Sequence, residues 1–197
     1  MMTKDELLGP LARQRSDRVV VTTMGIVRPW GRVSDSPFDF ASADSAMGHA
    51  ADFALGVALA QPQRQVICLN GDGSMLMTLG TLVTIVASRA TNLVLFVVEN
   101  GTYEVTGNQE VPGAGRTDFV AMAKAAGFAR AERFADAAAF EAALPTLLSA
   151  EGPVFVSVLV APGHEGPLGR GPEQSEPYLK LSLAESVRAL RRALTSR

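Results

Sequence analysis

The chain has 197 residues, of which 47% are hydrophobic, and this is enough for one ordinary domain with an apolar core. Lys and Arg number 18 against 20 Asp and Glu, so the charge balance provides no basic surface of the kind that binds nucleic acid or an anionic membrane. The single cysteine, Cys68, lies within an apolar run and is expected in the core, which excludes a cysteine-ligated metal centre.

The N-terminal residues "MMTKDELLGPLARQRSD" are charged and lack the apolar stretch of a signal peptide. No uninterrupted apolar run approaches the roughly 20 residues that a membrane span needs. We therefore expect a soluble cytoplasmic protein that has neither a membrane nor a nucleic acid as its partner.

Short apolar runs alternate with helical stretches along the chain. Strands are expected at 19–21, 65–69, 92–99 and 153–160. Helices are expected at 46–60, at 74–88 with Ser74 as a cap, from a cap at Thr117 to before Gly127, and at 136–150 with a kink at Pro145. Continuous apolar strands that alternate with helices predict a three-layer α/β/α fold, in which helices cover both faces of a mainly parallel sheet.

The composition changes after residue 160. The stretch "APGHEGPLGRGPEQSEPY" is rich in Gly and Pro and indicates an extended arm, and a last amphipathic helix is expected at about 182–195. We therefore expect one domain at 1–160, followed by a C-terminal arm and terminal helix at 161–197.

Polar residues follow two of the predicted strands. Asp72 follows the strand 65–69 within "GDGS", and Asn100 follows the strand 92–99. Ligands of parallel sheets bind beyond the carboxyl ends of the strands, so both side chains are expected at the binding edge. Asp-Gly is also typical of a tight hairpin turn, but a helix follows here and not a returning strand.

This arrangement suits a metal ion bound to a diphosphate. Mg²⁺ prefers oxygen ligands and is often held by one or two protein groups together with phosphate oxygens. Gly71 and Gly73 permit a close approach of the backbone, and a helix that starts at Ser74 would offer free N–H groups to anionic oxygens. Between Gly73 and Asn100 lie 26 residues, enough for one helix and one strand that return to the same edge of the sheet.

Three motifs in this order resemble one enzyme family. "AMGHA", "GDGS" and, 26 residues after the latter's second Gly, "NGTYEVTGNQ" are similar to the thiamine-diphosphate-dependent 2-oxo acid decarboxylases. The resemblance covers about residues 15–160 and corresponds to the diphosphate-binding half, the PP domain. It is strongest to sulfopyruvate decarboxylase beta subunits and phosphonopyruvate decarboxylases.

The resemblance implies a cofactor site that holds thiamine diphosphate and Mg²⁺. Asp72 and Asn100 would supply side-chain ligands to the metal, and the main-chain carbonyl of Thr102 would be the third ligand. Gly73 and Ser74 would meet the diphosphate, and Gly25 and Ile26 after the first strand would line its other side. Gly71 and Tyr103 would also belong to the cofactor-binding residues.

The resemblance also implies residues near the reacting centre. Met47 would lie beneath the cofactor and force the pyrimidine amino group towards the thiazolium C2, although core packing is the alternative. The main chain of Ser45 and Met47 would bond the pyrimidine edge. His49 is a candidate for proton transfer or substrate contact, or else an ordinary hydrogen-bonded helix residue.

Tyr103 and Glu104 would either close over the substrate or belong to a surface loop. At position 104, sulfopyruvate-type chains tend to carry Gly, whereas phosphonopyruvate-type chains resemble "HES-x-GGQ". The loop of this chain combines features of both groups, and the substrate stays open.

In this family a Glu that activates the cofactor belongs to a second domain, the PYR domain, for which this chain is too short. The resemblance therefore implies a separate PYR-domain subunit in an α2β2-like hetero-oligomer. Thiamine diphosphate would serve the decarboxylation of a small anionic 2-oxo acid, such as sulfopyruvate or phosphonopyruvate, to an aldehyde.

Three alternatives stay open at this point. The first is a carboligase of the acetolactate synthase type, and the second is a non-catalytic cofactor-binding or regulatory subunit. The third is a nucleotide-binding α/β protein, although the chain lacks the Gly-rich phosphate loops of that class.

Overall fold

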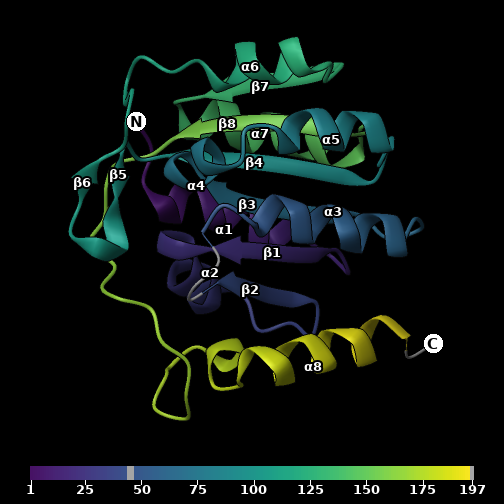
Figure 1. Ribbon diagram of the computed structural model, residues 1–197, viewed down its shortest axis with the longest axis vertical. Coiled ribbons are helices and arrows are strands. Elements are labelled where there is room, and N and C mark those ends of the chain that lie inside the picture. The colour runs from purple at the N-terminus through teal and green to yellow at the C-terminus, as the bar shows by residue number, and fades with distance from the viewer. Residues whose placement is uncertain (44–46, 196–197) are drawn as a thin grey trace.

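The computed structural model describes residues 1–43 and 47–195. A six-stranded sheet crosses the molecule, and each pair of neighbouring strands runs parallel (Figure 1). In spatial order the strands are β2 (Asp39–Ala43), β1 (Val19–Thr23), β3 (Val66–Gly71), β4 (Leu93–Glu99), β8 (Val154–Leu159) and β7 (Arg130–Phe134). The predicted parallel α/β/α fold is confirmed.

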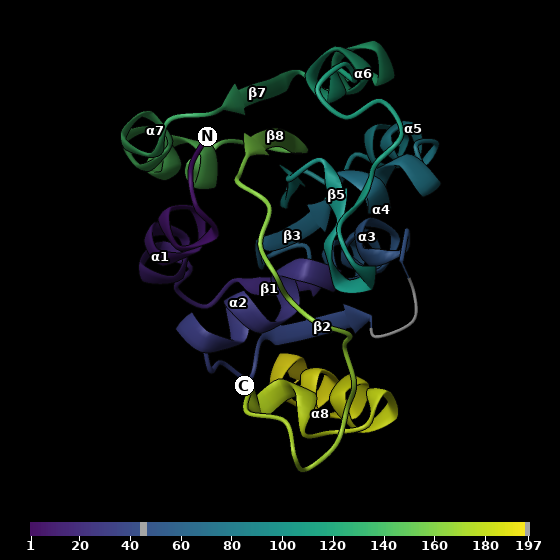
Figure 2. The ribbon, with the colours of Figure 1, turned by 90° about the vertical axis from the view of Figure 1, so that its left-hand side faces the viewer.

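Helices cover both faces of the sheet (Figure 2). One face packs against α1 (Lys4–Gln14), α2 (Val27–Val33) and α7 (Ala137–Ser149), and the other against α3 (Ala50–Ala60), α5 (Thr81–Ser88) and α6 (Phe119–Ala126). Successive strand residues point to opposite faces, so Phe96 enters the first core layer and Leu95 and Val97 the second. Both faces are buried, which explains the continuous apolar runs of the central strands.

Three adjacent strands deliver three loops to one edge of the sheet. β1 is followed by the short 3₁₀ helix η1 (Met24–Ile26), and β3 by α4 (Asp72–Met77). β4 leads into a small hairpin made of β5 (Thr102–Tyr103), the 3₁₀ turn η2 (Glu104–Thr106) and β6 (Gln109–Glu110). Because β1, β3 and β4 are neighbours, their carboxyl-end loops lie side by side.

The N-terminal segment and the segment that follows β8 also meet at this edge. α1 begins with a capping box in which Thr3 and Glu6 bond each other's main-chain N–H groups, and Met2 pairs with Val160 just after β8. From Ala161 the chain runs past the hairpin, through the 3₁₀ turn η3 (Pro177–Leu179), to α8 (Leu183–Thr195), which lies beside β2 (Figure 2).

Several predicted element boundaries were wrong. The helix expected from residue 46 begins at Ala50, and residues 44–46 lie outside the described part. The helix expected at 74–88 is two helices, α4 and α5, because Thr78 leaves the helical conformation and its hydroxyl donates to the carbonyl of Gly48. Ser74 therefore lies inside α4 and caps nothing.

The cap of α6 was also misplaced, since Asp118 and not Thr117 accepts the N–H of Ala121. Pro145 lies inside α7 as predicted. The sequence reading missed α1, α2, β2 and β7, which lack a long apolar run. β2 and β7 are the edge strands of the sheet, where one side of each strand has no partner strand to bury it.

Two exclusions can be compared with the structure. Cys68 is fully buried and free, as predicted. Within residues 1–43 and 47–195, no helix has the length and apolar character needed to cross a membrane.

A buried ion pair ties the C-cap residue of α1, Arg15, to the start of β2, and its removal should lower stability. Asp39 accepts hydrogen bonds from Arg15 (2.6 Å) and Ser34 (2.5 Å), and the side chains of Arg15 and Asp39 are only 7% and 3% exposed. Asp39→Ala leaves a buried guanidinium unpaired and should lower the free energy of unfolding by about 3–5 kcal/mol in urea denaturation. Asp17→Ala breaks the exposed pair with Arg64 and should cost about 0–1 kcal/mol; equal losses would contradict this account.

Candidate functional site

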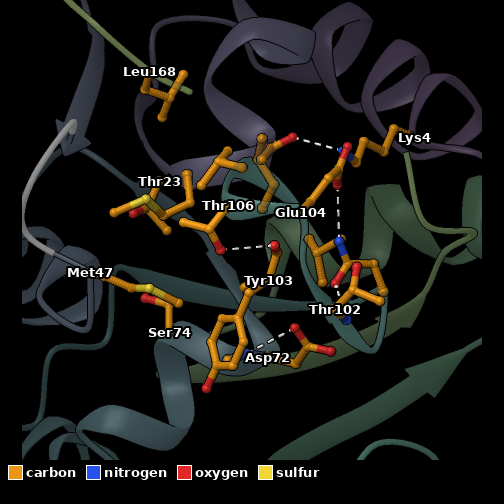
Figure 3. A pocket seen from close by; sticks show the side chains of 18 of the residues that line it. Lys4, Thr23, Met47, Asp72, Ser74, Thr102, Tyr103, Glu104, Thr106 and Leu168 are labelled. Carbon is orange, nitrogen blue, oxygen red and sulfur yellow. Dashed lines mark hydrogen bonds and ion pairs between the residues drawn. The ribbon is translucent and has the colours of Figure 1, made fainter. Parts of the chain in front are cut away.

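A cavity of about 300 Å³ lies at the carboxyl edge of β1, β3 and β4 (Figure 3). Of the predicted site residues that the structure describes, all except His49 line it. These residues come from the turn after β1, the turn before α3, the junction of β3 with α4 and the loop after β4: Gly25, Ile26, Met47, Gly71, Asp72, Gly73, Ser74, Asn100, Thr102, Tyr103 and Glu104.

The carboxylate of Asp72 joins two of these loops. Oδ1 accepts the N–H of Gly73 in the same turn (2.8 Å), and Oδ2 accepts the N–H of Gly101 from the loop after β4 (2.7 Å). Gly101 has a left-handed backbone (φ 73°), which a side chain would strain, so the Asn-Gly pair suits this contact. Each carboxylate oxygen keeps a lone pair for a further partner.

Burial raises the pKa of the Asp72 carboxyl above its ordinary value, and the N–H groups of Gly101 and Gly73 act against that rise. The cost of burying the charge is therefore only partly offset by the protein itself. A divalent cation beside the carboxylate would favour its ionised form.

Asn100 presents both ends of its amide to fixed partners. Its Nδ2 donates to Glu104 (3.0 Å), and its Oδ1 accepts the N–H of Thr102 (3.0 Å). The Oδ1 atom retains a second lone pair. Asp72, Asn100 and Thr102 thus bring a carboxylate, an amide oxygen and a main-chain carbonyl to one cavity, a donor set that suits Mg²⁺.

The first turn of α4 does not offer all the free N–H groups that were expected. The N–H of Gly73 already donates to Asp72, and the hydroxyl of Ser74 accepts the N–H of Gly48 (2.9 Å). The glycine is required for another reason. A Cβ at position 73 would come within 2.4 Å of the Tyr103 ring, which lies directly against this turn.

Thr23 is a lining residue that the sequence reading missed. Its side chain is fully buried, and its Oγ1 is one of the buried polar atoms without a hydrogen-bond partner among the described residues. A buried hydroxyl without a partner is unfavourable, so a ligand in the cavity is its natural partner. The position at the end of β1, at the same edge as Asp72, was the available signal.

Other lining residues come from the two ends of the chain. Lys4 belongs to the first turn of α1, and Pro167 and Leu168 belong to the C-terminal arm. Arg28 holds the arm in place by donating to the carbonyls of Gly166 (3.0 Å) and Pro167 (2.9 Å). No local motif marks these positions. Met24, Val98, Val105 and Thr106 complete the lining that sequence reasoning did not identify.

Two predicted residues remain to be accounted for. Ser45 lies outside the described residues. The His49 side chain is 63% exposed and lies 2.9 Å from Asp52, and the residue does not line the cavity. The structure therefore does not bring His49 to the site, and its catalytic role stays a prediction.

Glu104 is not the exposed surface-loop residue that was one of the two expectations for it. Its side chain is only 1% exposed, and its carboxylate pairs with Lys4 and accepts the N–H of Glu165 in the arm. Both oxygens are thus engaged within the chain, which does not suit an acid or base that reaches towards a substrate.

Comparison with known proteins identifies the family. Residues 32–158 match the family described as "Thiamine pyrophosphate enzyme, C-terminal TPP binding domain". The chain is 38% identical over 165 residues to the sulfopyruvate decarboxylase subunit beta of Methanothermobacter thermautotrophicus, which covers 83% of this chain and 85% of that protein. The chain belongs to the thiamine pyrophosphate enzyme family.

Two further matches are to proteins longer than this chain. Phosphonopyruvate decarboxylase of Streptomyces viridochromogenes is 37% identical over 151 residues, which are 77% of this chain and 36% of that protein. The solved structure of a thiamine diphosphate-dependent 4-hydroxybenzoylformate decarboxylase from Rhodococcus jostii superposes with a TM-score of 0.69 at 24% identity. That match covers 82% of this chain and 33% of the solved chain, so it supports the fold alone.

The cavity fits the cofactor of a thiamine pyrophosphate enzyme in its donor chemistry. Within the described residues, no three His, Cys, Asp or Glu side chains come close enough to form a metal site by themselves. A metal held by one carboxylate, one amide and one carbonyl needs further oxygens, and a diphosphate supplies them. The unpartnered hydroxyl of Thr23 is consistent with a ligand in the same space.

The contact between Gly73 and Tyr103 gives a direct test of the site's geometry. Gly73→Ala should lower the free energy of unfolding by about 1–3 kcal/mol, because the new methyl group overlaps the ring. Adding Tyr103→Ala should remove most of that loss in urea denaturation. Gly71→Ala is the matched control, since nothing lies within 4 Å of a Cβ there. An equal loss with and without Tyr103 would contradict the contact.

Proposed function

We propose that this chain is the PP-domain subunit of a thiamine-diphosphate- and Mg²⁺-dependent enzyme that decarboxylates a 2-oxo acid to an aldehyde. The observation that carries the proposal is the meeting of Asp72, Asn100 and Thr102 in one cavity, in a chain that belongs to the thiamine pyrophosphate enzyme family. The names of its relatives favour a substrate with an anionic substituent, such as sulfopyruvate or phosphonopyruvate.

In this proposal, Mg²⁺ is bound by the side chains of Asp72 and Asn100 and by the carbonyl of Thr102. The diphosphate lies against the turn of Gly71, Gly73 and Ser74 and against Gly25 and Ile26 after β1. The hydroxyl of Thr23 is then its further donor, since it has no other partner among the described residues. Tyr103 completes this wall, because its ring packs on Gly73.

Met47 is proposed to support the cofactor from below. Its side chain is half-buried and lines the cavity beside Ser74 (Figure 3). Gly48 anchors this turn to α4, because its N–H donates to Ser74 and its carbonyl accepts from Thr78 (2.5 Å).

When bound, thiamine diphosphate would supply a carbanion that adds to 2-oxo acids and a ring that accepts electrons as carbon dioxide leaves.

A partner subunit is the second part of the proposal. One relative is named as subunit beta of sulfopyruvate decarboxylase, which supports an α2β2-like hetero-oligomer with a separate PYR-domain chain that carries the activating Glu. Lys4 is the one cation among the cavity-lining residues that the structure describes, and its charge is paired with Glu104. We therefore expect the partner to provide the cation that recognises an anionic substrate.

A cytoplasmic location of the protein also stays a prediction.

Purification of the chain with its partner, followed by assay of carbon dioxide and product, tests this function. Sulfopyruvate and phosphonopyruvate are compared with pyruvate in the presence of thiamine diphosphate and Mg²⁺. Faster release of carbon dioxide and of an aldehyde from an anionic substrate supports the proposal. A coupled product with a new carbon–carbon bond would indicate a carboligase instead, and no turnover of any 2-oxo acid would indicate a non-catalytic subunit.

Asp72→Ala tests the metal site within this assembly. The variant removes the carboxylate ligand, so Mg²⁺-dependent binding of thiamine diphosphate and carbon dioxide release should both be lost. Binding is measured by isothermal titration calorimetry, and circular dichroism checks that the fold is retained. Asp52→Ala is the control, because Asp52 bonds Thr81 (2.5 Å) away from the cavity. Unchanged binding in Asp72→Ala would remove Asp72 from the metal site.

Thr23→Val separates cofactor binding from stability. The unpartnered hydroxyl is lost, so the free energy of unfolding should stay the same or rise by up to about 1–3 kcal/mol. The Kd of thiamine diphosphate should rise by roughly 10- to 100-fold, because a hydrogen bond to a charged group is lost. Thr22→Val is the control: its hydroxyl lies 3.3 Å from the Tyr178 hydroxyl, so it should lose stability and keep cofactor affinity. Unaltered affinity in Thr23→Val would refute the contact.

A further inference from the structure

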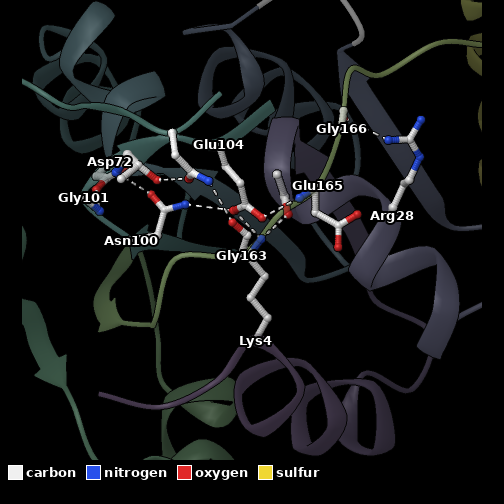
Figure 4. Close-up of polar contacts among 12 residues, drawn as sticks. Lys4, Arg28, Asp72, Asn100, Gly101, Glu104, Gly163, Glu165 and Gly166 are labelled. Carbon is white, nitrogen blue, oxygen red and sulfur yellow. Dashed lines mark hydrogen bonds and ion pairs between the residues drawn. The ribbon is translucent and has the colours of Figure 1, made fainter. Parts of the chain in front are cut away.

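A buried ion pair lies directly behind the proposed metal ligand Asn100 (Figure 4). Lys4 Nζ and Glu104 Oε2 are 2.5 Å apart, and their side chains are 11% and 1% exposed. The same Glu104 oxygen accepts the Nδ2 of Asn100 (3.0 Å). The pair is therefore continuous with the proposed metal site through a single hydrogen bond.

The neighbours of Asn100 permit only one orientation of its amide. A carboxylate only accepts hydrogen bonds and a main-chain N–H only donates them. Glu104 must therefore face the Nδ2 atom, and the N–H of Thr102 must face Oδ1. Rotating the amide by half a turn would place its oxygen against the Glu104 carboxylate and its NH₂ group against the N–H of Thr102. This matters for a metal site, because an amide oxygen binds a cation and an amide nitrogen does not.

Lys4 keeps the Glu104 carboxylate in this position. Its ammonium group also donates to the carbonyl of Gly25 (2.8 Å), on the turn after β1. Lys4 itself is fixed in the first turn of α1 by the Thr3 capping box. The ammonium group thus bridges the loops after β1 and β4, and it offsets the cost of burying the Glu104 charge.

The C-terminal arm engages the other oxygen of the same carboxylate. The N–H of Glu165 donates to Glu104 Oε1 (3.0 Å), and the side chain of Asn108 donates to the carbonyl of Gly163 (3.0 Å). Both carboxylate oxygens of Glu104 therefore accept hydrogen bonds from groups of this chain: Oε2 from Lys4 and Asn100, and Oε1 from the N–H of Glu165.

We propose that Glu104, held by Lys4, is a positioning residue that fixes Asn100 with its amide oxygen towards the metal. This inference rests on the proposed function, which makes Asn100 a metal ligand. Its two consequences are that the amide of Asn100 is ordered before the cofactor arrives, and that disrupting the pair weakens metal binding although no metal ligand is changed.

The first arm of the test measures metal affinity in variants of the full chain. Each variant is purified together with its partner. The measured quantity is the Mg²⁺ concentration that gives half-maximal binding of thiamine diphosphate. Glu104→Leu should raise it by about 10- to 100-fold, the usual effect of losing a group that orients a metal ligand. Lys4→Met should raise it in the same direction, and Lys4→Arg should restore it, because Arg keeps the charge.

Asp39→Ala is the control for stability, because it breaks a buried ion pair between the C-cap residue of α1 and β2 that does not line the cavity. It should leave the Mg²⁺ requirement unchanged. If Asp39→Ala raises the requirement as much as Glu104→Leu does, the pair acts through general stability and the proposal is wrong. An unchanged requirement in both Glu104→Leu and Lys4→Met would also overturn it.

The side-chain amide signal of Asn100 in ¹H–¹⁵N spectra of the cofactor-free chain provides the second arm. A hydrogen bond to a carboxylate should give this signal a shift that is lost in Glu104→Leu and kept in Asp39→Ala. A signal that does not respond to Glu104→Leu would overturn the inference. Failure of the wild-type chain to bind thiamine diphosphate at any Mg²⁺ concentration would overturn the proposed function instead, and this spectrum would still decide the orientation of Asn100.

Discussion

The carboxylate of Asp72 is the constraint on which the arrangement of this site depends. It is buried, and its two oxygens bond the N–H groups of Gly73 and Gly101, which belong to loops that follow different strands. The parallel sheet brings these loops to the same edge, and the carboxylate fixes the distance between them. The two N–H groups offset only part of the cost of burying the charge, since burial still raises the pKa of the Asp72 carboxyl. A cation beside the carboxylate would stabilise its ionised form. Stability of the loop pair and the proposed affinity for a metal therefore depend on the same atoms.

Much of the site could be predicted because its residues lie immediately after buried strands. An apolar run such as 92–99 identifies a buried strand, and the polar residue that follows must lie at the binding edge of a parallel sheet. This reasoning placed Asp72 and Asn100 correctly beside one cavity. Applied to the Thr-Thr pair after Val21, it would also have found Thr23.

The rest of the site depends on contacts between residues far apart in the sequence. Lys4 and Glu104 are separated by 100 positions, and no local pattern predicts that they meet. The helix that carries Lys4 did have a signal, the Thr-x-x-Glu capping box at residues 3–6, but its apolar face is short. The arm that brings Leu168 to the cavity has only a composition typical of irregular structure. Its path is set by hydrogen bonds to Arg28 and Glu104.

Native mass spectrometry of this chain, purified gently from its own cells, tests the central claim most directly. The claim is that the chain binds thiamine diphosphate and Mg²⁺ and completes its active site with a second polypeptide. The account predicts a hetero-oligomer whose mass exceeds that of its chains by thiamine diphosphate and Mg²⁺. A chain found only alone or with copies of itself, and without the mass of a cofactor, would contradict it.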